Sequence, residues 1–346
     1  MNHTNFVSPT TLGIITTYKC SAQCEDCCFS CSPKNNTRIT LADLKETIGK
    51  VAQQVPIKVV VFTGGETTLL GQDLYSALGY CKELGLTTRI ITNGFWGCSP
   101  NAINMKLDKL IENGLNELNL STGDNHQKFV SIENVMNISY EAVRRGLPTL
   151  ISVEKAKGFH FGLSDIFDHP IYSRIQTLEN SHLFKAMSSP WVSLKNPQKY
   201  EYDEGCLATN QLGCNSLFEN ITIDATGKIY SCCGLTVREI SEFYVGNISE
   251  NFCDELSYIN QEGYDKYFLI KYWIYTDGPV NIIKKVKEWC PDIIIPEFAH
   301  QCLYCQAIFN NPIIRDVIEK NIYDIQEEIL EKFHNKVNFL NQFKGA

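Results

Sequence analysis

Short apolar runs alternate with helical patterns along the first half of the chain. Five runs predict strands because each is a short apolar segment between helical patterns. Between the runs, apolar residues recur at helical spacing, as at Leu44, Ile48 and Val51. A sixth strand is expected near residues 171–178. This alternation predicts βα units with a parallel sheet, and therefore an α/β fold. The five runs cover residues 12–16, 58–63, 87–92, 115–121 and 147–154.

The loop after the first predicted strand carries three cysteines. Cys20, Cys24 and Cys27 form the pattern C-x3-C-x2-C. A cubane iron–sulfur cluster has four irons that each need a ligand, so three thiolates leave one iron open for a further ligand. Zinc is the alternative, because Cys28 or Cys31 could supply a fourth thiolate. The spacing predicts a metal centre with a cluster as the preferred occupant.

A second motif, Gly64-Gly65-Glu66, ends the second predicted strand. Alone, this string would be an ordinary tight turn. Together with the cysteine triad it resembles the radical SAM superfamily. The resemblance implies a partial (βα)6 barrel, a [4Fe–4S] cluster on the three cysteines, and S-adenosyl-L-methionine (SAM) bound to the open iron. It also implies that the backbone of the glycine pair approaches the methionyl amino group of SAM.

Further polar residues fall at the carboxyl ends of predicted strands, where such barrels bind their ligands. Glu66, Asn93 and Ser121 are therefore candidate cofactor-binding residues. Ser121 could contact the ribose or the carboxylate of SAM, or it could cap a turn. For Asn93, a turn at Asn93-Gly94 is an equal alternative. His126 could contact the substrate, but a solvated loop histidine is the preferred interpretation.

The C-terminal part carries a second set of cysteines. Cys214 and Cys232 flank a predicted hairpin whose turn lies near Gly227, and Cys302 and Cys305 form a C-x2-C pair. Four thiolates are expected to converge. The pattern is similar to the twitch domain, the shortened form of the SPASM domain, which implies one auxiliary [4Fe–4S] cluster. A zinc site with four cysteine ligands is the alternative.

Cys233 directly follows the predicted ligand Cys232. Strand alternation turns neighbouring side chains to opposite faces, so Cys233 should point away from the cluster. An S–H group is a good hydrogen-atom donor to a carbon radical. The alternatives for Cys233 are a spare ligand or a core cysteine.

Several strings occur in the same order as in the epipeptide epimerases, which convert L-residues of a ribosomally made peptide to D-residues. They are CCFSCSP at 27–33, FTGGE at 62–66, NGFWG at 93–97, IYSCC at 229–233, and C-x2-C at 302–305 before IFN. The resemblance implies that Cys233 returns a hydrogen atom to the substrate. One position departs from the family: an acidic residue on the strand entering the hairpin aligns with Asn220, and Glu219 lies one residue away.

Composition limits the partners. The net charge of −8 and the pI near 5.5 argue against nucleic acid. No apolar run is long enough to span a bilayer, and the nearest, residues 267–275, is expected to be a packed amphipathic segment. The chain has 15 cysteines and no signal peptide, which predicts a reducing, cytoplasmic setting without a membrane partner.

These observations predict a radical SAM peptide epimerase with two [4Fe–4S] clusters, SAM, a ribosomal precursor peptide and an electron donor such as flavodoxin or ferredoxin. One rival is a radical SAM peptide cyclase that forms thioether or carbon–carbon crosslinks. A second rival is a non-catalytic iron–sulfur or zinc regulator. The expected domains are a tail at 1–10, the barrel at 11–200, the twitch domain at 201–310 and a helical tail at 311–346.

Overall fold

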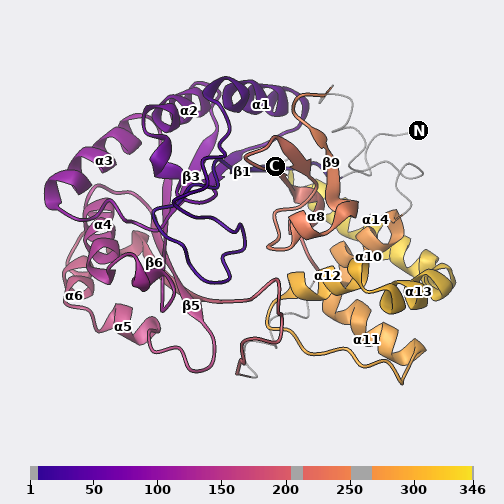
Figure 1. Cartoon of the computed structure of the whole chain (residues 1–346). Helices are drawn as coiled ribbons and strands as arrows, with labels where there is room; N and C mark the ends of the chain where they lie inside the picture. Colours follow the sequence, from indigo (N-terminus) through magenta and orange to yellow (C-terminus); the bar gives the residue numbers. More distant parts are fainter. Residues whose placement is uncertain (1–6, 204–212, 251–266, 345–346) are drawn as a thin grey trace. The chain divides into compact units, whose positions relative to one another are not determined.

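The computed structural model describes residues 7–203, 213–250 and 267–344. The chain divides into two compact units (Figure 1). The barrel unit contains Thr11–Ser193 together with Ile223–Gly227. The C-terminal unit contains Leu194–Thr222 and Lys228–Ala346, together with Met1–Thr10.

The barrel unit is built on six parallel strands that follow one another across the sheet in chain order. Helices alternate with the strands and cover the outer side of the sheet (Figure 1). This α/β arrangement confirms the predicted fold class, and the register starts with Thr11 opposite Val59. The strands are β1 (Thr11–Ile15), β2 (Val59–Thr63), β3 (Thr87–Thr92), β4 (Glu117–Thr122), β5 (Thr149–Lys155) and β6 (Phe184–Pro190).

The helices of this unit begin at local capping signals. Thr40 Oγ1 accepts a hydrogen bond from Asp43 N at 3.1 Å, and Ser99 caps the next-but-one helix in the same way. The predicted apolar stripe of the first helix, which includes Leu44 and Ile48, is buried. The helices are α1 (Leu41–Gln54), α2 (Gln72–Glu83), α3 (Pro100–Glu112), α4 (Ile132–Arg144), α5 (Leu163–Phe167) and α6 (Pro170–Gln176), with short 3-10 turns η1 (Thr67–Leu70), η2 (His126–Lys128) and η3 (Ser181–Leu183).

The prediction of a sixth strand at residues 171–178 is wrong. Most of that segment is helix α6, which starts with Pro170 in the first turn and is capped by His169. Ile171 and Ile175 are buried one helical turn apart. The sixth strand, β6, lies further on and pairs along β5 over its whole length. Its sequence, FKAMSSP, has low intrinsic strand propensity, so pairing with β5 outweighs local preference.

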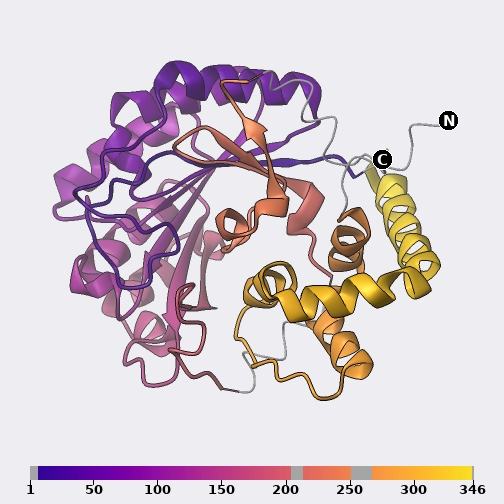
Figure 2. The ribbon, with the colours of Figure 1, turned by 45° about the vertical axis from the view of Figure 1, so that its right-hand side comes forward.

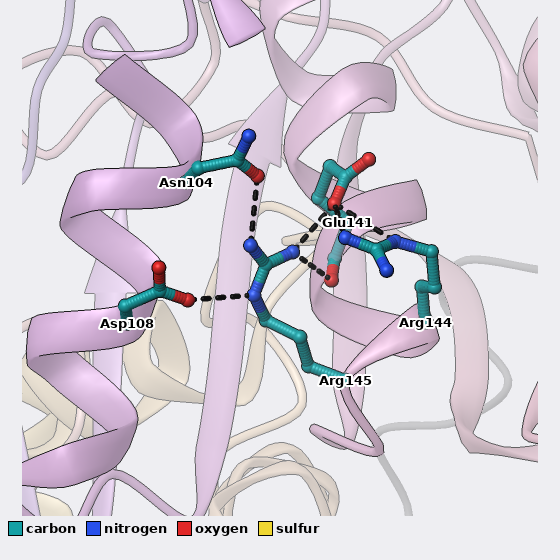
Figure 3. Close-up of polar contacts among 5 residues, drawn as sticks. All are labelled: Asn104, Asp108, Glu141, Arg144 and Arg145. Carbon is teal, nitrogen blue, oxygen red and sulfur yellow. Dashed lines mark hydrogen bonds and ion pairs between the residues drawn. The ribbon is translucent and has the colours of Figure 1, made fainter. Parts of the chain in front are cut away.

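A cluster of charged side chains joins α3 to the end of α4 (Figure 3). Arg145 donates to Asp108 Oδ1 at 3.0 Å and to Asn104 Oδ1 at 2.7 Å, and it also pairs with Glu141. Arg144 shares Glu141 at 2.7 Å, a contact within one helix. Only 17% of the Arg145 side chain is exposed, against 48% for Arg144. Arg145 is therefore the member that connects the two helices.

The C-terminal unit contains an antiparallel strand pair and five helices of ten or more residues among its described residues, and the hairpin turn before that pair belongs to the barrel unit. Asp224 Oδ1 accepts from Thr226 N at 2.8 Å, and Gly227 has a φ of 84°, so the predicted turn of the hairpin is present. The strands are β7 (Asn220–Ile223), β8 (Lys228–Tyr230) and β9 (Tyr244–Asn247). The helices are α8 (Ser216–Glu219), α10 (Phe268–Asp277), α11 (Pro279–Trp289), α12 (Gln301–Asn310), α13 (Pro312–Asn321) and α14 (Gln326–Lys344), with 3-10 turns η5 (Val237–Glu239), η6 (Ser241–Phe243) and η8 (Ile322–Ile325).

Helix α10 is packed, as predicted, but it is not amphipathic. Every residue from Leu269 to Tyr275 is buried, including Lys271. Phe333 of α14 stacks on Tyr272 with ring centroids 3.7 Å apart, so this helix packs against α10. Figure 2 shows the yellow helix α14 turning away from the gold helix α13. No helix among the described residues is long and apolar enough to cross a membrane.

We predict that Arg145→Met lowers the free energy of unfolding by about 1 kcal/mol, because it removes partly buried ion pairs between two helices. Arg144→Met is the matched control and should cost about 0.3–0.5 kcal/mol, as for exposed pairs within one helix. Chemical denaturation of the apoprotein measures both values. Equal losses for the two variants would contradict the connecting role of Arg145.

Candidate metal and cofactor site

The three cysteines of the barrel unit share one short loop after β1. Cys20 is buried and packs with Ile15 and Tyr18, while Cys24 and Cys27 are partly buried against the same group. Backbone hydrogen bonds fasten both ends of the loop: Cys20 N donates to Ser32 O at 3.2 Å, and Ser32 N donates to Tyr18 O at the same distance. The loop therefore presents three thiols from a fixed base.

The loop gives its thiols different acidities. Burial raises the pKa of Cys20 to about 11 and that of Cys24 to about 12. A hydrogen bond from Cys31 lowers the pKa of Cys27 to about 6. Thiolates are the form that binds iron, so loading of this loop must release protons from Cys20 and Cys24.

Gly64 and Gly65 let two stretches of backbone approach each other closely. Gly65 N donates to Thr17 O at 2.7 Å, and Glu66 N donates to Lys19 O at 2.8 Å. A Cβ on Gly65 would lie 2.1 Å from Lys19 O, and one on Gly64 would lie 2.5 Å from Thr17 O. Gly64 also has a φ of 133°, which disfavours any other residue. The glycine pair is therefore required where the end of β2 contacts the start of the cysteine loop.

The Glu66 carboxylate is completely buried and lies among hydrogen-bond donors. It accepts from Thr68 N at 3.1 Å, from Thr92 Oγ1 at 2.8 Å and from Asn93 N at 2.9 Å. Burial raises the pKa of Glu66, and the hydrogen bonds oppose that shift. Glu66 thus joins the end of β2 to the end of β3.

Asn93 adopts the predicted turn and also contacts the cysteine loop. Its Oδ1 accepts from Phe95 N at 3.0 Å, while its Nδ2 donates to Ser21 Oγ at 3.0 Å and to Cys20 Sγ at 3.6 Å. Ser121, the remaining candidate, lies at the carboxyl end of β4, half-buried, and is paired in register with Ser152 of β5.

His126 is not the solvated loop residue that the sequence suggests. Its Nδ1 is in hydrogen-bond contact with buried Glu154, whose carboxylate also accepts from Asn125 N at 2.8 Å and from His126 N at 3.0 Å. The His126 ring meets Trp191 edge-on, with centroids 5.6 Å apart. In the sequence, the only indication of this contact is that Glu154 lies at the end of a predicted strand.

In the C-terminal unit, the four predicted thiols line one cavity with several apolar side chains. Cys214, Cys232 and Cys305 are buried, and partly buried Cys302 completes the set. Cys214 precedes the hairpin and Cys232 follows it. Cys302 and Cys305 lie in the first turns of α12. His300 caps this helix, because its Nδ1 accepts a hydrogen bond from Cys302 N at 3.2 Å. Burial raises the pKa of Cys302 to about 12.

Gly234 lies against two of these sulfurs. Its N–H donates to Cys232 Sγ at 3.2 Å. A Cβ at this position would lie 2.9 Å from Cys302 Sγ and 3.4 Å from Cys232 Sγ. The chain therefore needs glycine at 234 to keep the two thiols together.

Cys233 differs from its neighbour in exposure. It does not line the cavity, it is exposed, and its thiol contacts the Ser216 hydroxyl. At the position that departs from the epimerase pattern, Asn220 Nδ2 donates to Ser216 O at 3.3 Å, whereas Glu219 Oε1 accepts from Tyr275 OH at 2.8 Å.

The donor sets fit iron–sulfur clusters in kind: three thiols in one loop for a cluster with an open iron, and four thiols around one apolar cavity for a closed one. In the part of the chain that the structure describes, no group of three or more His, Cys, Asp or Glu side chains lies at the spacing of a single metal ion.

Comparison with known proteins points to one superfamily. Residues 14–171 match the model of the radical SAM superfamily. The match runs from within β1 to the start of α6 of the barrel unit. The chain is 26% identical over 308 residues to YydG of Bacillus subtilis (strain 168), which is named as a peptide biosynthesis protein. The aligned region covers 85% of this chain and 90% of the relative.

Two solved structures share the radical SAM fold with this chain. Streptococcus suis SuiB bound to S-adenosylmethionine has a TM-score of 0.51 at 15% identity, with 81% of this chain and 76% of that chain covered. Native anSMEcpe with bound AdoMet and Cp18Cys peptide has a TM-score of 0.51 at 12% identity, with 93% and 99% covered. Proteins of the superfamily whose model matches bind a [4Fe–4S] cluster and SAM.

We predict that Gly65→Ala abolishes loading of the radical SAM cluster, because the new methyl group would displace the backbone of Lys19 beside Cys20. Reconstituted protein should lose about four irons per chain and all SAM cleavage. Gly71→Ala is the control: it introduces backbone strain at a φ of 58° but meets no atom within 4 Å. Full iron content and normal SAM cleavage in the Gly65 variant would show that the cysteine loop does not need glycine at this position to bind its cluster.

Proposed function

We propose that this chain is a radical SAM enzyme that converts L-residues of a ribosomally made peptide to D-residues. The observation that carries the proposal is the pair Cys232-Cys233: one thiol lines a four-cysteine cavity and the next is exposed. The similarity to YydG, named for peptide biosynthesis, supports a peptide substrate. The strings shared with epipeptide epimerases support the reaction.

Two sets of cysteines would hold the metal. Cys20, Cys24 and Cys27 would bind the radical SAM cluster. An auxiliary cluster would make the C-terminal unit a twitch domain, with Cys214, Cys232, Cys302 and Cys305 as its ligands. When bound, the first cluster and SAM supply a 5′-deoxyadenosyl radical that removes a hydrogen atom from a substrate.

Cys233 would complete the reaction. Loss of the Cα hydrogen leaves a carbon radical, and the Cys233 S–H bond breaks to return one hydrogen atom from the opposite face. The product is an epimer, and the sulfur is left as a thiyl radical. One electron and one proton restore the thiol, and one electron is needed for SAM cleavage, so we propose a flavodoxin or ferredoxin as donor. This requirement fits a reducing, cytoplasmic setting.

The other predicted residues would orient SAM. Gly64 and Gly65 would offer backbone groups to its amino group, and Ser121 would contact its ribose or carboxylate. Glu66 and Asn93 would act indirectly, since the Glu66 carboxylate and the Asn93 amide are engaged within the protein.

Metal content tests the two cluster sites. We predict about eight irons per chain in anaerobically reconstituted protein and about four after Cys20, Cys24 and Cys27 are replaced by Ala. Gly234→Ala should also leave about four irons, because its methyl group would displace Cys302 Sγ, but it should retain SAM cleavage. Iron and zinc analysis with SAM-cleavage assays measures these values. Bound zinc, or four irons in the native protein, would overturn the auxiliary cluster.

The reaction itself is tested on a precursor peptide encoded beside the gene. We predict unchanged product mass in ordinary water and a gain of one mass unit per D-residue in D2O, because a thiol exchanges its hydrogen with solvent. Cys233→Ala should keep both clusters and still release 5′-deoxyadenosine, yet form no D-residue. Cys98→Ala, which removes another exposed thiol, should behave like the native enzyme.

Other outcomes would change the assignment. D-residues formed at the native rate by Cys233→Ala would remove this thiol from the mechanism. A lower iron count in that variant would make Cys233 a cluster ligand. Loss of two mass units in ordinary water would indicate a crosslinking enzyme instead.

A further inference from the structure

The Asn93 side chain donates a hydrogen bond to a ligand sulfur. Its Nδ2 lies 3.6 Å from Cys20 Sγ, and this sulfur also accepts from Ala22 N at 3.4 Å. Asn93 and Cys20 are 5% and 9% exposed. At such burial, solvent screens the N–H···S interaction weakly, so its effect on the charge of the sulfur is strong.

The orientation of the Asn93 amide is fixed by its neighbours. Its Oδ1 accepts from Phe95 N at 3.0 Å, so the amide nitrogen must face the other way, toward Ser21 and Cys20. The backbone of Asn93 is held by the Glu66 carboxylate, which accepts from Asn93 N at 2.9 Å. The donor is therefore pre-set before any cluster is loaded.

We propose that Asn93 raises the reduction potential of the radical SAM cluster by donating to Cys20 Sγ. Reduction adds negative charge to the cluster and its thiolates, and a hydrogen bond to a thiolate stabilises the more negative state. Asn93 is thus a tuning residue that acts through Cys20, in contrast to a direct contact with SAM. The proposal rests on the radical SAM domain and is independent of the epimerase assignment.

The experiment is a redox titration of the cluster followed by electron paramagnetic resonance. The radical SAM cluster is identified by the change in its signal when SAM is added. Asn93→Ser keeps a side-chain oxygen that can accept from Phe95 N but removes the donor to Cys20. At a fixed potential, its ratio of reduced to oxidised cluster should fall about tenfold, which for a one-electron couple corresponds to a downward shift of about 59 mV.

Two further variants separate tuning from a structural role. Ser21→Ala removes the other partner of the amide but leaves the Asn93–Cys20 hydrogen bond, so its potential should match the native protein. Asn93→Asp keeps the size and the turn acceptor while replacing the donor with an oxygen, so its potential should fall as well.

The iron content of each variant decides whether the potentials can be compared. Native iron with lower potentials in both Asn93 variants supports the proposal. An unchanged potential in either loaded variant overturns it. Failure of both Asn93 variants to load the cluster, in protein that folds normally, also overturns it, because Asn93 would then serve loading instead of potential.

Discussion

The buried Glu66 carboxylate is the constraint on which this end of the barrel unit depends. A carboxylate without solvent is unfavourable unless donors surround it. Thr68, Thr92 and Asn93 supply those donors from the turn after β2 and the end of β3. Satisfying the charge therefore fixes the two strand ends together. The position of the Asn93 amide beside Cys20 follows from that arrangement.

The glycine pair shows how one motif can serve two purposes. A GGE string predicts backbone access for SAM, but the structure adds a packing requirement, because Gly65 touches the backbone of Lys19. The approach is too close for any side chain. The motif therefore shapes the cysteine loop before any ligand binds. This packing role does not depend on whether the glycines also contact SAM.

The sequence was informative where local pattern decides the structure. The first five strands followed from short apolar runs between helical patterns, and the convergence of Cys214, Cys232, Cys302 and Cys305 followed from a hairpin and a C-x2-C pair. It failed where long-range contacts decide. Strand β6 exists because β5 supplies its partners, and the position of His126 depends on a carboxylate 28 residues away. Neither contact leaves a local pattern in the sequence.

Both cysteine sites have backbone donors to sulfur, such as Ala22 N to Cys20 Sγ, but they differ in the side-chain contacts to their sulfurs. Around the β1 loop, side chains of Asn93 and Cys31 reach Cys20 and Cys27, and Cys24 and Cys27 remain partly accessible. Around the C-terminal cavity, the contacts come from backbone, as with Gly234 N on Cys232 Sγ, and Cys232 and Cys305 are buried. Side-chain donors can be changed residue by residue, whereas backbone donors come with the fold. The first site therefore has the features of an adjustable, open centre and the second those of a closed one, which is the division of labour expected when one cluster must receive a ligand and the other must not.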